Sequence, residues 1–158
     1  LTVEKHDDLL TMDFPSFSLA PVPVTEEISQ AIGITPQKVF LGADMVCILE
    51  SEDQVRKAKP DQEIIRSLDG VCFHITAPGS NYDCVTRSFA PKCNVAEDPV
   101  CGRAHCHVIP YWSRILGKTD LTAYQASARG GILYCRYSGP RTQISGKAAL
   151  YSEAELYL

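Results

Sequence analysis

The residues from about Gly102 to Leu116 constrain the fold of this chain more than any other segment. The stretch has the pattern of a helix that ends at Gly117. Its apolar residues lie on nearly its whole circumference: Ala104, Val108, Ile109, Tyr111, Trp112, Ile115 and Leu116. A helix that is apolar all round is buried on all sides, so other elements must enclose it. Pro110 inside this helix predicts a kink or a distorted turn.

Most of the remaining chain is predicted to form strands, which supply that enclosure. Alternating or short apolar runs predict strands over 9–14, 38–41, 45–49, 71–76, 82–89, 121–126, 132–137 and 142–150, with an extended linker at 20–24. Short helices are predicted over 26–32, 51–58 and 61–68, where Thr25, Ser51 and Asp61 have the residue types of N-caps. About eight strands and one long buried helix predict the α+β class, with a mixed β-sheet curled barrel-like around a central buried helix.

Composition limits the classes of function. A chain of 158 residues fits a single domain, and a net charge of −4 provides no basic surface for nucleic acid or anionic lipid. The apolar runs are too short to cross a membrane. Seven cysteines, an odd number with irregular spacing and mostly apolar neighbours, predict a reduced, cytoplasmic protein without a disulfide framework. The first residue is Leu1, so the chain is expected to begin within a longer protein.

The segment from Glu97 to Cys106 is the strongest candidate for a functional site. It places an acid pair, a turn-forming proline and a glycine directly before the long helix. Free amides at a helix start bind anions, and a carboxylate just upstream can orient an ammonium group or move a proton. Asp98 is therefore a candidate catalytic residue, although an acid in this place also serves as a helix cap.

Several motifs together resemble the phenazine biosynthesis PhzF-like family over essentially the whole chain. They are Met12–Pro15, Arg87–Pro91, Glu97–Gly102, His105-Cys106, Pro110–Trp112, Gln125–Gly131 and Ile144–Ala148. The resemblance implies a fold like that of diaminopimelate epimerase, with two similar barrel-like halves and the active site between them. By this resemblance residues 1–158 are the C-terminal half, and the N-terminal half with its catalytic Glu and Gly-His motif is absent. The isolated chain is then expected to be inactive.

The same resemblance implies roles for four residues. Asp98 matches the acid that contacts the substrate's amino group, and Gly102 matches the glycine whose backbone approaches the substrate carboxylate. Arg103 stands where the family usually has Ser, and a guanidinium can bind a carboxylate through two bonds instead. Cys101 stands where Thr is usual, and related epimerases use a Cys there as an acid–base group. A small buried cysteine without a chemical role is the alternative.

The predicted function is a cofactor-independent isomerase or epimerase acting on a small amino- or hydroxy-carboxylate. Alternatives are a Cys-dependent racemase that uses Cys101 and a non-catalytic partner-binding scaffold, including a possible homodimer. No metal is expected: His105, Cys106, His107, Cys93 and Cys101 lack paired ligand spacing. Arg87 and Arg129 are interpreted as structural residues.

Overall fold

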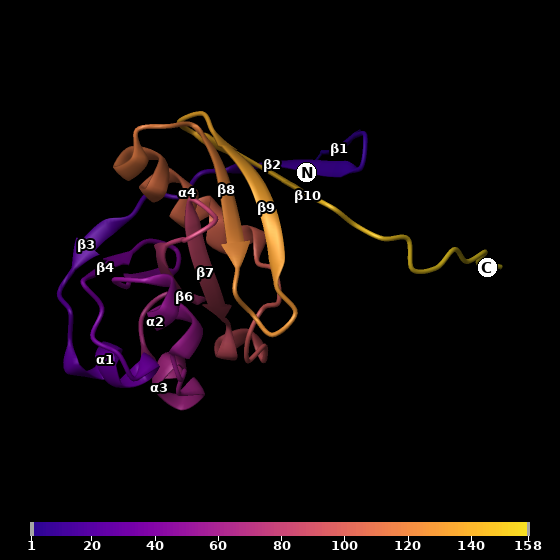
Figure 1. The fold of residues 1–158 in the computed structure, drawn as a ribbon. Helices are drawn as coiled ribbons and strands as arrows, with labels where there is room; N and C mark the ends of the chain where they lie inside the picture. Colours follow the sequence, from indigo (N-terminus) through magenta and orange to yellow (C-terminus); the bar gives the residue numbers. More distant parts are fainter. Residues whose placement is uncertain (1, 158) are drawn as a thin grey trace.

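One mixed sheet of ten strands dominates the part of the chain that the structure describes. The structure is a computed structural model that describes residues 2–157. The strand order is β1-β2-β10-β9-β8-β7-β6-β5-β4-β3 (Figure 1). The pairs β5–β6 and β7–β8 are parallel and the other pairs are antiparallel. The strands are β1 (Val3–His6), β2 (Leu9–Pro15), β3 (Ala20–Val22), β4 (Lys38–Leu41), β5 (Met45–Ile48), β6 (Phe73–Pro78), β7 (Cys84–Phe89), β8 (Asp120–Gln125), β9 (Gly131–Tyr137) and β10 (Arg141–Gly146).

The helices begin and end at the residue types that the sequence predicts. They are α1 (Glu26–Ile32), α2 (Glu52–Lys57), α3 (Gln62–Ser67), the 3₁₀ turn η1 (Pro91–Cys93) and α4 (Gly102–Leu116). The side chains of Thr25, Ser51 and Asp61 accept hydrogen bonds from amides of the first turns, which confirms them as N-caps. Gly33 and Gly117 end α1 and α4 with positive φ angles of 69° and 68°. None of the described helices is both long and apolar enough to span a membrane.

The sheet carries a separate hydrophobic core on each face. Along β5, Met45 and Cys47 belong to the core that includes α1–α3, whereas Val46 and Ile48 belong to the core around α4. This alternation follows from the two-residue period of a strand. Figure 1 shows α1–α3 gathered beside β4 and β6, and α4 next to β8. Helix α4 is buried over Ala104–Ser113, as its apolar circumference predicts, but Ile115 and Leu116 in its last turn are exposed.

The connection between β2 and β3 shows that the sheet is bent and not flat. These strands lie eight positions apart in the sheet, a separation of about 38 Å if the sheet were flat. Only residues 16–19 link them, and five peptide steps span at most about 18 Å. Within the described residues β1 and β3 nevertheless remain edges, so the predicted barrel-like closure is not found. The structure confirms the α+β class and the mixed sheet.

Pro110 leaves a backbone carbonyl of α4 free to bind residues 16–19, the segment that links β2 and β3. Proline has no amide hydrogen, so the carbonyl of Cys106, four residues earlier, loses its partner within α4. The amide of Phe17 donates to that oxygen at 3.0 Å. The helix continues through Pro110 to Leu116. The Cys106 carbonyl, which has no partner within the helix, instead accepts the hydrogen bond from Phe17.

Several strand predictions require correction. The segment predicted as a linker at 20–24 contains β3, and β1 was not predicted because its side chains are all exposed and carry no apolar alternation. The last strand ends at Gly146 and not at residue 150. Beyond that glycine the chain no longer pairs with β2, so the apolar residues that follow are exposed.

Candidate active site at the start of helix α4

The loop before α4, residues 97–101, is held by side chains from neighbouring strands. The amide of Asp98 donates to the carbonyl of Ser88 on β7 at 2.9 Å. The side-chain amide of Gln125, at the end of β8, donates to the Asp98 carbonyl at 2.9 Å and accepts from the Cys101 amide at 3.1 Å. Gln125 is completely buried, so this loop is fixed by a two-sided bridge that solvent does not reach.

The turn between β8 and β9 is joined to the same loop. The Ser127 hydroxyl donates to the Pro99 carbonyl at 2.7 Å and accepts from the Gly130 amide at 3.0 Å. A Cβ at position 131 would lie 2.5 Å from a methyl carbon of Val100, so only glycine allows this approach. The loop and the turn are therefore joined by hydrogen bonds and by a close packing contact.

Glu97 anchors the other end of the loop. Its carboxylate accepts two bonds from Arg87, from Nε at 2.8 Å and from Nη2 at 2.9 Å. The Nη1 of Arg87 also donates to the carbonyl of Ala58 just after α2, at 2.9 Å. Arg87 thus joins β7, α2 and the loop, in agreement with its interpretation as a structural residue.

The predicted site residues lie together around the first turn of α4. Asp98 Oδ1 accepts from the Val100 amide at 3.1 Å, and Cys101 is the N-cap, with Sγ 3.4 Å from the Ala104 amide. Within the described residues the amides of Gly102 and Arg103 have no hydrogen-bond acceptor, as is usual in a first turn. Gly102 lines an open cavity of about 890 Å³.

The Cys101 thiol is buried, and this determines its protonation. Burial raises its pKa to about 12, although the bond from the Ala104 amide acts in the opposite direction. At neutral pH the group is therefore a neutral thiol. The helix start alone would predict a lowered pKa, and the loss of hydration outweighs that effect here.

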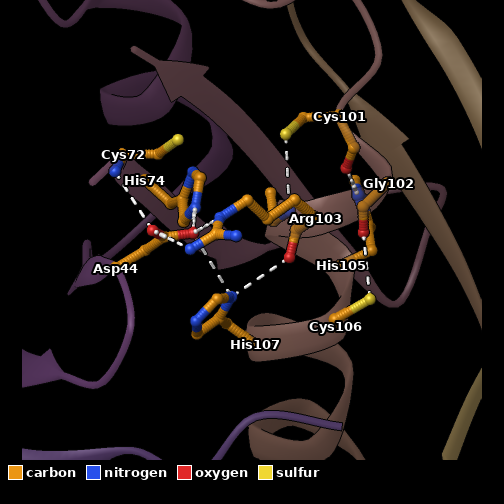
Figure 2. Close-up of polar contacts among 10 residues, drawn as sticks. Asp44, Cys72, His74, Cys101, Gly102, Arg103, His105, Cys106 and His107 are labelled. Atoms are coloured by element: carbon orange, nitrogen blue, oxygen red, sulfur yellow. Dashed lines mark hydrogen bonds and ion pairs between the residues drawn. The ribbon is translucent and has the colours of Figure 1, made fainter. Parts of the chain in front are cut away.

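Arg103 does bind a carboxylate through two bonds, and the carboxylate belongs to the protein. Its Nε donates to Asp44 Oδ2 at 2.7 Å and its Nη2 to Oδ1 at 2.9 Å (Figure 2). Asp44 comes from the turn between β4 and β5 and is completely buried, whereas 40% of the Arg103 side chain is exposed. The pair fastens the first turn of α4 to the sheet.

Two histidines point at the same carboxylate (Figure 2). His74 Nε2 lies 3.1 Å and His107 Nδ1 3.6 Å from Asp44 Oδ2, and the Cys72 amide donates to Oδ1 at 3.1 Å. The ring of His107 stacks on Phe17, with centroids 4.3 Å apart. Ligand-type atoms of Asp44, His74 and His107 lie within 4.8 Å of one another, but both carboxylate oxygens already accept bonds from Arg103. This occupied carboxylate makes the cluster a poor metal site.

Burial and charge shift the pKa values of this cluster in a consistent way. Burial would raise the pKa of Asp44, but the bonds from His74 and Arg103 together hold it well below its usual range. Burial lowers the pKa of His107 to about 4, and that of the neighbouring His105 also to about 4. At neutral pH the cluster therefore contains an ionised Asp44, a charged Arg103 and neutral side chains at His105 and His107.

Sequence reasoning missed Asp44, His74 and Gln125. Asp44 ends the Gly42-Ala43-Asp44 hairpin turn, where an acid is normally solvated, and its partner Arg103 is 59 residues away. Gln125 is a polar residue at an inward position of β8, with the alternation Leu121, Ala123, Gln125 all buried. That register was the one available signal, because a buried polar residue requires hydrogen-bond partners.

Comparison with known proteins agrees with this fold. A family model described as phenazine biosynthesis-like protein matches residues 6–154. An uncharacterized isomerase of Pseudomonas aeruginosa is 43% identical over 159 residues, and a second one from the same organism is 38% identical over 158. The chain spans 61% of the length of each of these relatives.

Solved structures give the same picture. A phenazine biosynthesis protein of the PhzF family from Enterococcus faecalis superimposes with a TM-score of 0.93 at 40% identity. The match covers 99% of this chain and 60% of that one. A putative phenazine biosynthesis protein from Clostridium difficile superimposes with a TM-score of 0.89 at 37% identity and is covered over 61% of its length.

Proposed function

The chain belongs to the phenazine biosynthesis-like family. From this premise we propose that it forms part of a cofactor-independent isomerase or epimerase. The reaction would move a proton on a small amino- or hydroxy-carboxylate by acid–base catalysis. The names of the Pseudomonas aeruginosa relatives support an isomerase. The observation that carries the proposal is that Asp98 precedes the free amides of Gly102 and Arg103 at the start of α4, and that Gly102 lines an open cavity.

In this proposal the substrate carboxylate accepts hydrogen bonds from the amides of Gly102 and Arg103. These donors lie at the positive end of α4, where an anion is stabilised. The Asp98 carboxylate orients the amino or hydroxyl group and takes part in the acid–base transfer, whose main base the second half would supply. Gln125 and Ser127 hold the loop so that these groups keep their positions.

The domain assignment is part of the same proposal. The bent sheet around α4 would be one of two similar barrel-like halves, and a second half would supply the facing wall with the main base. The share of 61% that the chain covers in its relatives supports this arrangement. The seven free thiols support a reducing, cytoplasmic location.

An alternative proposal assigns the proton transfer to the Cys101 thiol. Its sulfur lies at the helix start, as such chemistry would require. A thiol pKa of about 12 leaves little thiolate at neutral pH, so the proposal rests on Asp98.

The test is exchange of the substrate's α-proton in D₂O by the protein that contains both halves, followed by NMR over a panel of amino- and hydroxy-carboxylates. Asp98→Asn should slow exchange by about a hundredfold or more while the carboxylate still shifts the Gly102 and Arg103 amides. Asp69→Asn, an exposed acid in the loop after α3, is the matched control. Exchange that survives Asp98→Asn at the full rate contradicts the proposal.

A further inference from the structure

A positively charged side chain, Arg129, lines the cavity beside Gly102, and the proposed function does not use it. The cavity volume of about 890 Å³ is large enough for a small organic substrate. Leu10, Met12, Val100, Leu133 and Ile144 give it an apolar wall, and Arg129 lies at its rim. None of the ion pairs within the described residues involves Arg129.

The backbone of Arg129 is held in a fixed position relative to the start of α4. Arg129 lies in the turn between β8 and β9, which Ser127 joins to the Pro99 carbonyl. On the other side of Arg129, Gly130 has a φ of 72° and donates to the Ser127 hydroxyl. The turn cannot move away from the loop without breaking these bonds, so the backbone of Arg129 stays beside the cavity that its side chain lines.

The other charges near this cavity are already neutralised. Lys147 lines it as well, but its ammonium pairs with Asp8. Arg103 is paired with the buried Asp44 and is not among the residues that line the cavity. Arg129 is therefore the side chain at this rim that has all its donors free to bind an anionic group from solution.

We propose that Arg129 is a specificity-determining residue that binds a second anionic group of the substrate. This inference rests on the proposed function. One carboxylate would bind the amides of Gly102 and Arg103, and a second would bind the Arg129 guanidinium through two parallel bonds. The apolar residues that line the same cavity suit a short hydrocarbon spacer. The ligand class is a small dicarboxylate with an apolar middle.

The test compares adipate with hexanoate, two acids of equal chain length that differ by one carboxylate. Binding to the full chain is followed by ¹⁵N NMR at the Gly102 and Arg103 amides. Adipate should bind about tenfold more tightly than hexanoate, because one charge-assisted bidentate contact is added. Arg129→Gln should remove this difference and leave the hexanoate affinity unchanged, and Arg129→Lys should restore part of it.

Controls separate the possible outcomes. Arg66→Gln removes an exposed, unpaired arginine on α3 and should preserve the preference for adipate. Unchanged amide shifts of Ser127 and Gly130 show that the turn is intact in Arg129→Gln. Equal affinity for both acids, or a preference that survives Arg129→Gln, overturns the inference alone. Failure of both acids to shift the Gly102 and Arg103 amides overturns the proposed function and the inference with it.

Discussion

Arg103 and Asp44 form the contact in which a single side chain has the largest predicted effect on stability. Replacement of Arg103 by Ser, the residue usual in the family, would leave a buried carboxylate without its bidentate partner. We expect a loss of about 2–3 kcal/mol of unfolding free energy, less than for a fully buried pair because Arg103 is partly exposed. Urea unfolding measures it, and Asp44→Asn in the same chain should recover most of the loss.

A surface arginine provides the comparison for that experiment. Arg136 pairs with Asp120, and both side chains are more than 60% exposed. Arg136→Ser should therefore change the unfolding free energy by less than about 1 kcal/mol. Equal losses for the two arginine variants would contradict the role given to Asp44.

The buried Cys101 predicts a specific order of thiol reactivity. Its raised pKa and its burial should make alkylation by iodoacetamide at pH 7.5 very slow, whereas the exposed Cys93 should react first. Mass spectrometry of the alkylated peptides measures the order, and Cys93→Ser removes the fast-reacting site. Rapid labelling of Cys101 in the folded protein would contradict this prediction and would support the alternative of a racemase that uses Cys101.

At the scale of elements, Gln125 ties strand β8 to the loop before α4. Gln125→Glu keeps the shape of the side chain, but its ionised form cannot donate to the Asp98 carbonyl. The folded state should therefore raise the pKa of the new carboxyl above its unfolded value. Stability should match that of the original protein at pH 4, where the carboxyl is protonated, and fall progressively below it as the pH rises.

The matched control for this prediction is Gln143→Glu, at an exposed position of β10. Its unfolding midpoint should not show a comparable fall between pH 4 and pH 7. A pH-independent effect of Gln125→Glu would mean that the bridge does not depend on the donated bond.

The elements also show which parts of the fold could be predicted from sequence. Helix bounds at Thr25, Gly33 and Gly117 were predicted because a cap depends on its own residues and their near neighbours. The pairing of Asp44 with Arg103 was not, because it depends on how β5 and α4 meet. Asp98 and Gly102 could be proposed as site residues from their local motif, whereas Gln125 acts through backbone groups 24 and 27 residues away.

For the whole molecule, the buried histidines predict a loss of stability in mild acid. Burial lowers the pKa of His105 and His107 to about 4, whereas a histidine in the unfolded chain has a pKa of about 6.5. The unfolded state then binds more protons between these values, so stability falls as the pH drops from 6.5 to 4. Below this range the protonation of Asp44, whose folded pKa is also lowered, should reduce stability further.

Urea midpoints from pH 8 to pH 4 measure this dependence. His105→Gln should reduce the slope by up to one proton, whereas His6→Gln, at an exposed position, should leave it unchanged. A flat profile in the original protein would contradict the neutral state given to the buried histidines.

The pairing of β2 with β10 has a consequence for how the chain reaches its folded state. Asp13 and Gln143 are neighbours across this pair, although 129 residues lie between them in the sequence. A high contact order of this kind slows folding, because a long loop must close before the contact stabilises it. During synthesis, β2 is made long before β10, so the hairpin of β1 and β2 must wait for its partner strand.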